Sequence, residues 1–118
     1  MFQSLAHMTL AFKITGSGTT RNLTGVGFQP DWVWTKARNN AYEHQIYDVV
    51  RGAGSTNSLS SNSINSESSG NVALYGYVSA FNSDGFTGTN GTDGTIPSAY
   101  FNQSGTTYVS WNGKANGT

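Results

Sequence analysis

Residues 31–36, Asp-Trp-Val-Trp-Thr-Lys, are the stretch that decides the fold class, because their large side chains alternate. Successive side chains of an extended strand point to opposite faces, so Trp32 and Trp34 share one face and Val33 lies on the other. Gln29-Pro30 comes just before this stretch and favours a turn, since proline fixes φ and biases the preceding residue towards an extended conformation. The stretch therefore predicts a β-strand that follows a turn.

The same period of two recurs on both sides of this strand. Leu10, Phe12 and Ile14 alternate with polar or small residues, which predicts a strand before residue 31. After it, residues 82–85 (NSDG) form a strong turn signal between two further strands. No apolar stripe with a helical period of useful length is present. Further strands are predicted at residues 21–26, 42–50 (with Ile46, Val49 and Val50 as core candidates), 72–81, 86–87, 100–102 and 106–112.

Seven or eight short strands separated by turn signals predict an all-β fold. We expect a single domain built as an antiparallel two-sheet β-sandwich of the jelly-roll-like type. Only 36% of the 118 residues are hydrophobic, so the aromatic residues, at 13%, must supply much of the core. Trp32, Trp34 and Trp111 are first of all candidates for that core, and the shared face of the first two is also what a platform for a stacked sugar would require.

Charge and composition exclude several partners. The chain has six basic and six acidic residues, a formal net charge of +0 and no cysteine. A nucleic-acid binder would show a basic excess, and a membrane span would need roughly 20 consecutive apolar residues. We therefore expect no nucleic-acid partner and no membrane, and neither a disulfide nor a thiolate metal site can form.

Residues 1–8 resemble a protease-site remnant followed by a cloning scar. We therefore expect the natural domain to occupy residues 9–118. His7 falls in the remnant, which leaves His44 as the histidine available for chemistry.

Five motifs follow one another along the domain. In chain order they are residues 27–34 (GFQPDWVW), His44 with Tyr47-Asp48 and Arg51-Gly52, Leu59 with Ser61-Asn62 and Glu67, residues 81–86 (FNSDGF), and Asn102 with Ser104-Gly105 and residues 108–111 (YVSW). Together they resemble a β-sandwich domain common in tail, fibre and other virion proteins of bacteriophages, grouped with concanavalin-like and laminin-G-like jelly rolls. That family often carries a second aromatic residue where this chain has Gly113. The resemblance implies a β-sandwich on a virion surface or in an extracellular setting.

The sequence lacks the residue patterns of common catalytic sites. No G-x-S-x-G elbow accompanies His44, as a serine nucleophile with a histidine base would require. The acidic residues do not form the close E-x-D-x-x-E cluster that jelly-roll glycosidases carry on one strand. They are Asp31, Glu43, Asp48, Glu67, Asp84 and Asp93. We expect a protein that is not an enzyme and that holds no cofactor and no metal.

Three charged or titratable residues each have a structural and a functional interpretation. His44 is either a structural histidine hydrogen-bonded inside the sheet or a surface contact. Arg51 either ties its strand end to Asp48 or Glu67 or clamps a ligand. Asp84 precedes Gly85 and is either an Asx-type turn cap or a calcium ligand.

Residues 55–70 and 88–94 are rich in Ser, Thr, Asn and Gly, and both segments are longer than a strand connection needs. Rigid sandwiches commonly display binding residues on such loops. We expect a virion structural or adhesive domain, of the tail-fibre or capsid-decoration type, that associates with itself or with other virion proteins. The alternatives are a carbohydrate-binding module with a glycan as ligand and a non-viral cell-surface adhesion domain. The candidate ligand-binding residues are Trp32, Trp34, His44, Asn62, Asn90 and Asp93.

Overall fold

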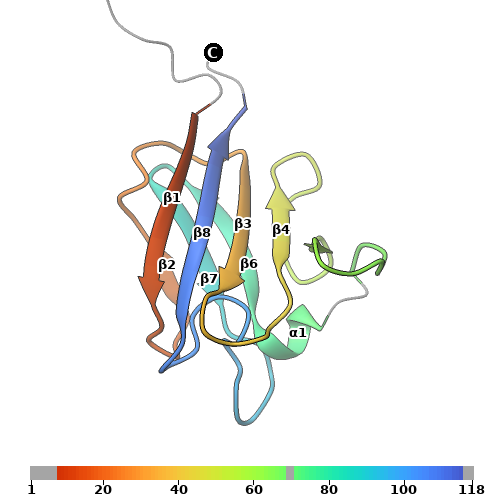
Figure 1. Cartoon of the computed structure of the whole chain (residues 1–118). Helices are drawn as coiled ribbons and strands as arrows, with labels where there is room; N and C mark the ends of the chain where they lie inside the picture. Colours follow the sequence, from red (N-terminus) through yellow and green to blue (C-terminus); the bar gives the residue numbers. More distant parts are fainter. Residues whose placement is uncertain (1–7, 69–70, 116–118) are drawn as a thin grey trace, which may run out of the picture.

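Two antiparallel sheets form the part of the chain that the computed structural model describes, residues 8–68 and 71–115 (Figure 1). The larger sheet has the strand order β1-β8-β3-β4-β5, and the smaller sheet has the order β2-β7-β6. The strands are β1 (Met8–Thr15), β2 (Arg21–Leu23), β3 (Trp32–Ala37), β4 (Gln45–Asp48), β5 (Leu59–Ser60), β6 (Tyr77–Asn82), β7 (Gly85–Thr89) and β8 (Thr107–Lys114), with one short helix, α1 (Val72–Tyr75). The predicted fold, a single antiparallel two-sheet β-sandwich, is confirmed.

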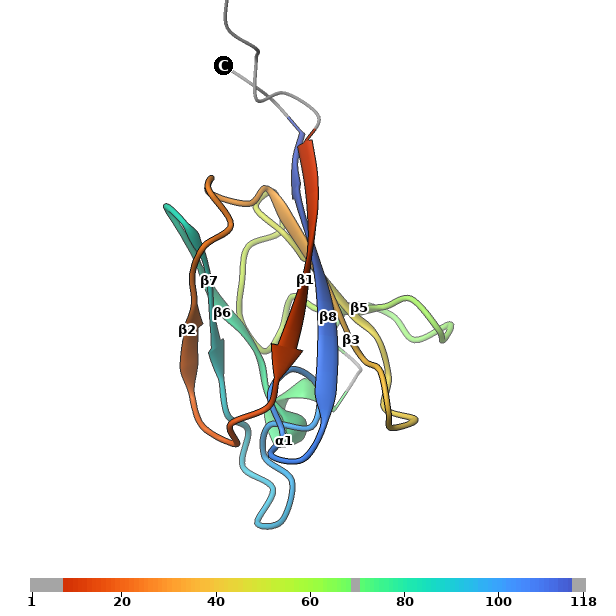
Figure 2. The same ribbon diagram turned by 60° about the vertical axis from the view of Figure 1, so that its left-hand side comes forward.

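The sheets lie face to face, and Figure 2 shows the smaller sheet as a separate layer to the left of the larger one. The main core fills the space between these layers with alternate residues of the strands. Its fully enclosed side chains include Val33, Tyr47 and Tyr108 from the larger sheet and Val78 and Phe86 from the smaller sheet.

Several buried positions of the larger sheet are polar. Thr35, Ser110 and Asn112 all point into the sandwich. The Oγ1 hydroxyl of Thr35 donates to the carbonyl of Tyr100 at 3.2 Å, and the Nδ2 group of Asn112 donates to Ser110 Oγ at 3.0 Å. These hydrogen bonds offset the cost of burying polar atoms in a chain whose hydrophobic content is low.

The first and last described strands pair along their whole length. The register runs from Met8 opposite Lys114 to Thr15 opposite Thr107. Ile14 is buried whereas Lys13 is exposed, so the predicted alternation of this strand is confirmed. The two ends of the described chain therefore lie side by side at one end of the larger sheet.

The long strand predicted at residues 72–81 is wrong in its first half. Residues 72–75 form the turn of helix α1, and Leu74 is 41% exposed. The backbone of Gly76 has a φ of 101°, a conformation that glycine adopts readily, and it ends the helix before β6 begins. Residues 100–102, also predicted as a strand, form turns between β7 and β8.

The core positions predicted in β4 are also wrong. Val49 is 45% exposed and Val50 92% exposed, and Ile46 is half-buried on the outer side of the sheet. The inward positions belong to Gln45 and Tyr47, which pair with Thr35 and Val33 of β3. Because β4 pairs with β3, its register with β3 decides which of its side chains point into the core. The hydrophobicity of the segment alone does not decide this.

Candidate functional site

An apolar row crosses the outer face of the larger sheet. The register pairs Trp34 with Ile46 on one side and with Trp111 on the other, and it extends the row to both edge strands. The row, called the apolar row below, consists of Leu59 (β5), Ile46 (β4), Trp34 (β3), Trp111 (β8) and Ala11 (β1).

The two tryptophans at the centre of the row pack on each other. The ring centroids of Trp34 and Trp111 are 5.0 Å apart and their planes are tilted by 48°. Both side chains are half-buried, with the smaller sheet on the opposite side of β3 and β8. The expectation that the tryptophans form the inter-sheet core is therefore wrong, because Val33 and Tyr108 fill that space instead.

Trp32 extends this face towards one end of the sheet. Its cross-strand partner in β8 is Gly113, and a Cβ atom at Gly113 would lie 1.9 Å from Trp32 Nε1. The indole of Trp32 thus rests directly on the glycine backbone. The space that a side chain at position 113 would need is occupied by this ring.

Charged groups flank the apolar row. On one side Val109 pairs with both Lys36 and Lys13, so the outer face carries two cations there. Asp48 pairs with Trp32 on the other side. Partial burial and the charge of Lys36 both lower the pKa of His44, which favours a neutral imidazole at neutral pH.

His44 and Asn62, both predicted as ligand-binding residues, lie together next to the edge strand β5. The Oδ1 atom of Asn62 accepts hydrogen bonds from the His44 backbone N–H at 3.0 Å and from Ser60 Oγ at 2.9 Å. The His44 Nδ1 atom is 3.1 Å from Ser61 Oγ. The histidine ring is therefore held by the turn that follows β5.

Asn90 and Asp93 lie in the connection between β7 and β8, and their side chains form hydrogen bonds within this connection and, from Asn90, to the loop between β1 and β2. Asn90 donates to the carbonyl of Gly18 at 3.1 Å and accepts a short hydrogen bond from Ser98. The Oδ2 atom of Asp93 accepts the backbone N–H groups of Thr95 and Ile96, which lower the pKa of its carboxyl. These two predicted residues are not part of the outer face.

The side chains of Asp84 and Arg51 each hold neighbouring segments of the chain in place. The carboxylate of Asp84 accepts the N–H groups of Gly25, at 2.9 Å, and Gly27, at 2.6 Å. It therefore holds the loop before β3, and the predicted Asx-type cap of its own hairpin is wrong. Arg51 contacts Asp48 at 2.6 Å and Glu67 at 3.6 Å, which confirms the predicted structural tie.

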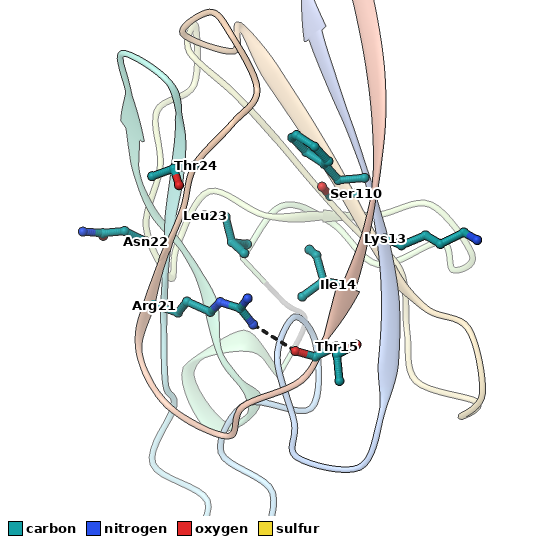
Figure 3. A pocket seen from close by; sticks show the side chains of 9 residues that line it. Lys13, Ile14, Thr15, Arg21, Asn22, Leu23, Thr24 and Ser110 are labelled. Carbon is teal, nitrogen blue, oxygen red and sulfur yellow. Dashed lines mark hydrogen bonds between the residues drawn. The ribbon is translucent and has the colours of Figure 1, made fainter.

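A cleft of about 390 Å³ lies where β1 and β2 diverge at the open edge of the sandwich. Figure 3 shows Ile14 and Leu23 pointing into it from the two sheets. The Nη1 group of Arg21 donates to the carbonyl of Thr15 at 2.9 Å and to Asn102 Oδ1 at 3.0 Å. The guanidinium is thus engaged in joining the two edges of the sandwich.

A second pocket, of about 290 Å³, was not anticipated from the sequence. Its lining contains three tyrosines and one carboxylate from segments far apart in the chain. The lining residues are Ala41, Tyr42, Glu43, Tyr75, Ile96, Ala99 and Tyr100. Spacing along the sequence gives no signal for such a pocket, since tertiary packing alone brings these residues together.

Two features define the class of protein: an antiparallel β-sandwich and an apolar row on the outside of its larger sheet. The chain belongs to the family described as a domain of unknown function, DUF7483, whose match spans residues 6–118. No curated protein and no solved structure matches the chain. The match overlaps the predicted remnant at residues 6–8, and residues 1–7 lie outside the described part of the chain.

Among the described residues, no three His, Cys, Asp or Glu side chains gather as metal ligands would. Within the same ranges, no helix is long and apolar enough to cross a membrane.

Proposed function

We propose that this chain is a non-catalytic structural or adhesive domain that assembles with another protein through the outer face of its larger sheet. The observation that carries the proposal is the apolar row, with the Trp34–Trp111 pair at its centre. The setting we propose is a virion surface, in a tail fibre or a capsid decoration. That setting is supported by the five motifs that resemble phage virion domains.

The composition of this face supports a protein-binding role. The solvent side of an antiparallel sheet is ordinarily polar, whereas this one carries two tryptophans, an isoleucine and a leucine in a single row. Contiguous apolar patches on a domain surface mark interaction sites, and tryptophan is enriched among the residues that dominate binding energy. Covering this row would remove large ring surfaces from water.

The geometry favours a flat protein surface over a sugar. The two central rings are tilted by 48° and half-buried, and aliphatic Ile46 and Leu59 continue the row. A row that crosses every strand of the sheet can be covered by the same row of a second copy, in the self-complementary contact of a two-fold dimer. We therefore propose a second copy as the partner.

Carbohydrate binding is the second candidate, and one observation favours it. Trp32 and Trp34 lie on the same outer face of β3, which pairs with β4. His44 directly precedes β4, and its backbone N–H donates a hydrogen bond to Asn62 Oδ1. An indole and nearby amide or imidazole groups are the elements of a sugar site. In this case the domain would bind glycans as a monomer.

The two candidates are separated by measuring the light-scattering mass across a concentration series, with Leu59→Lys and Ala11→Lys as variants. Both positions are exposed ends of the apolar row, so a lysine there leaves the core intact. We expect the parent to reach the mass of a dimer and the two variants to remain monomeric. Val50→Lys is the matched control, because Val50 is 92% exposed and lies off the row.

A monomeric parent, or equal masses for the parent and both row variants, would contradict assembly through this face. Glycan-array binding by a monomeric parent that Trp34→Ala abolishes would support the second candidate instead.

A further inference from the structure

The tyrosine pocket is built from three segments of the chain. Tyr42 and Glu43 come just before β4, Tyr75 ends α1, and Ile96, Ala99 and Tyr100 belong to the connection between β7 and β8. The backbone N–H of Tyr100 donates to the carbonyl of Tyr75 at 3.1 Å. Figure 2 shows α1 at the lower end of the sandwich, away from most of the outer sheet face.

Two of the rings form a fixed corner. The centroids of Tyr75 and Tyr100 are 5.3 Å apart, and their planes meet at 60°. Tyr100 is only 6% exposed, and both Tyr42 and Tyr75 pack against the buried cluster of Val72, Ala99 and Tyr100. The aromatic walls of the pocket are therefore held in place before any ligand arrives.

The pocket carries a single charge. Glu43 is the one ionisable carboxyl in the lining, and no lysine, arginine or histidine accompanies it there. The hydroxyl of Tyr100 donates to Glu43 Oε2 at 3.5 Å. Burial, together with the negative charge of Glu43, raises the pKa of Tyr100 to about 12, so this hydroxyl remains a donor at neutral pH.

We infer that this pocket binds a methylated ammonium group, as carried by choline-type headgroups and methylated amines. Such a cation is apolar on its surface and positively charged at its centre. Tyrosine ring faces attract it through their quadrupoles, and a nearby carboxylate balances its charge. Ile96, Ala41 and Ala99 supply alkyl contacts for the methyl groups.

A sugar would use this pocket poorly. Sugar hydroxyls need several donors and acceptors around them, whereas the side chains here offer the tyrosine hydroxyls and Glu43. The hydroxyl of Tyr100 and one oxygen of Glu43 already satisfy each other. The inference is independent of the proposed assembly through the apolar row, because the two sites share no residue.

The test is a titration of the ¹⁵N-labelled protein with choline, followed by amide chemical shifts. Its comparison ligand is 3,3-dimethylbutan-1-ol, which replaces the quaternary nitrogen with carbon and keeps the shape. We expect saturable shifts at Ala41, Glu43 and Ala99 with choline, and affinity weaker by about tenfold for the neutral alcohol. Sodium chloride at equal ionic strength should leave these amides unchanged.

Two variants locate the contribution of each wall. Glu43→Gln should weaken choline binding by about threefold and leave it tighter than binding of the neutral alcohol, because the ring faces still attract the cation. Tyr75→Leu keeps an apolar wall but removes a ring face, and it should lose most of the binding. Glu67→Gln removes the same charge from an exposed position outside the pocket and should bind choline as the parent does.

Equal affinity for choline and the neutral alcohol would overturn the inference, as would unchanged choline binding by Glu43→Gln. Absence of choline binding, or saturable shifts of the same amides with a neutral monosaccharide, would also overturn it. If Tyr75→Leu lowers the melting temperature sharply, the neutral ligand and Glu43→Gln still decide the question, because neither alters the packing of the rings.

Discussion

At the scale of single residues, the contact between Trp32 and Gly113 shapes one end of the outer face. Gly113 has no side chain, and Trp32 on the neighbouring strand β3 covers the glycine that the register places opposite it. An aromatic side chain supplied from β3 thus covers the backbone at this point of β8.

We predict that Gly113→Ala destabilises the domain by about 1–3 kcal/mol, because the new methyl group collides with the Trp32 indole and forces it to move. Thermal denaturation should show a lower melting temperature, and the tryptophan fluorescence spectrum should shift as the ring is displaced.

Gly94→Ala is the matched control, since a Cβ atom there meets no heavy atom within 4 Å. Equal melting temperatures for the two alanine variants would show that Trp32 does not rest on Gly113.

At the scale of elements, Arg51 fixes the connection between β4 and β5. Its Nε group donates to Asp48 Oδ2 at 2.6 Å, and its Nη1 group donates to the carbonyl of Asn57 at 2.7 Å. A third hydrogen bond, from Nη2, reaches the carbonyl of Ile46 at 3.3 Å. One side chain thereby joins the end of β4 to the start of the edge strand β5, and so positions one end of the apolar row.

The same contact makes stability depend on pH. Burial raises the pKa of Asp48, but the hydrogen bonds from the backbone and guanidinium of Arg51, together with its charge, outweigh burial and lower the pKa below its ordinary value. A carboxyl with a depressed folded-state pKa stabilises the fold at pH values above its unfolded pKa, and this stabilisation is lost as the pH falls through the folded pKa.

We predict that Arg51→Gln lowers the free energy of unfolding by about 1–2 kcal/mol at pH 7. This value is reduced because the Arg51–Asp48 ion pair is partly exposed to solvent. Urea denaturation between about pH 2 and 7 should show that the difference in free energy of unfolding between parent and variant becomes smaller in acid. There Asp48 is protonated in both proteins, so its charge no longer interacts with Arg51 in the parent.

Arg38→Gln serves as the control, because Arg38 is an exposed arginine outside this connection. A difference in free energy of unfolding that stayed constant from pH 7 to pH 2 would mean that Arg51 acts through packing and not through the charge of Asp48.

At the scale of the whole molecule, the pairing of β1 with β8 joins the two ends of the described chain. β1 forms an edge of the larger sheet and sends Leu10, Phe12 and Ile14 towards the smaller sheet. It also contributes Ala11, the last member of the apolar row. The larger sheet, and with it the proposed assembly face, is complete only when β1 pairs with β8.

We predict that removal of residues 1–7, which precede β1, changes the free energy of unfolding by less than about 0.5 kcal/mol. Removal of residues 1–15 should abolish cooperative unfolding, because each buried apolar side chain contributes about 1.5–3 kcal/mol to a total of roughly 5–15 kcal/mol. Circular dichroism melting curves of the two truncated proteins measure the difference.

A cooperative transition in the protein that lacks residues 1–15 would contradict the structural role assigned to β1. A large loss of stability on removing residues 1–7 would show that the segment before β1 contributes to the stability of the domain.

The proposed face was only partly visible in the sequence. Alternation placed Trp32 and Trp34 together, and the structure confirms that they share a face. Trp111, Ile46 and Leu59 joined them through the register of four neighbouring strands, which spans positions 34–111 of the chain. Asn90 and Asp93 were chosen from loop composition, but both side chains are engaged in hydrogen bonds within the protein, Asn90 with the loop between β1 and β2 and Asp93 with its own connection.

The sequence by itself determined the local geometry. Backbone sterics and neighbouring residues produce the period-two alternation in β1 and β3 and the turn at residues 82–85. These features can therefore be predicted from the sequence without knowledge of the fold. The tertiary structure decided which face of each strand was covered. Alternation says that Trp32 and Val33 lie on opposite faces, but the smaller sheet packs on the side of Val33 and leaves the tryptophans outside. Long-range packing likewise assembled the tyrosine pocket, because burial depends on which segments meet across the molecule and not on the order of residues within one of them.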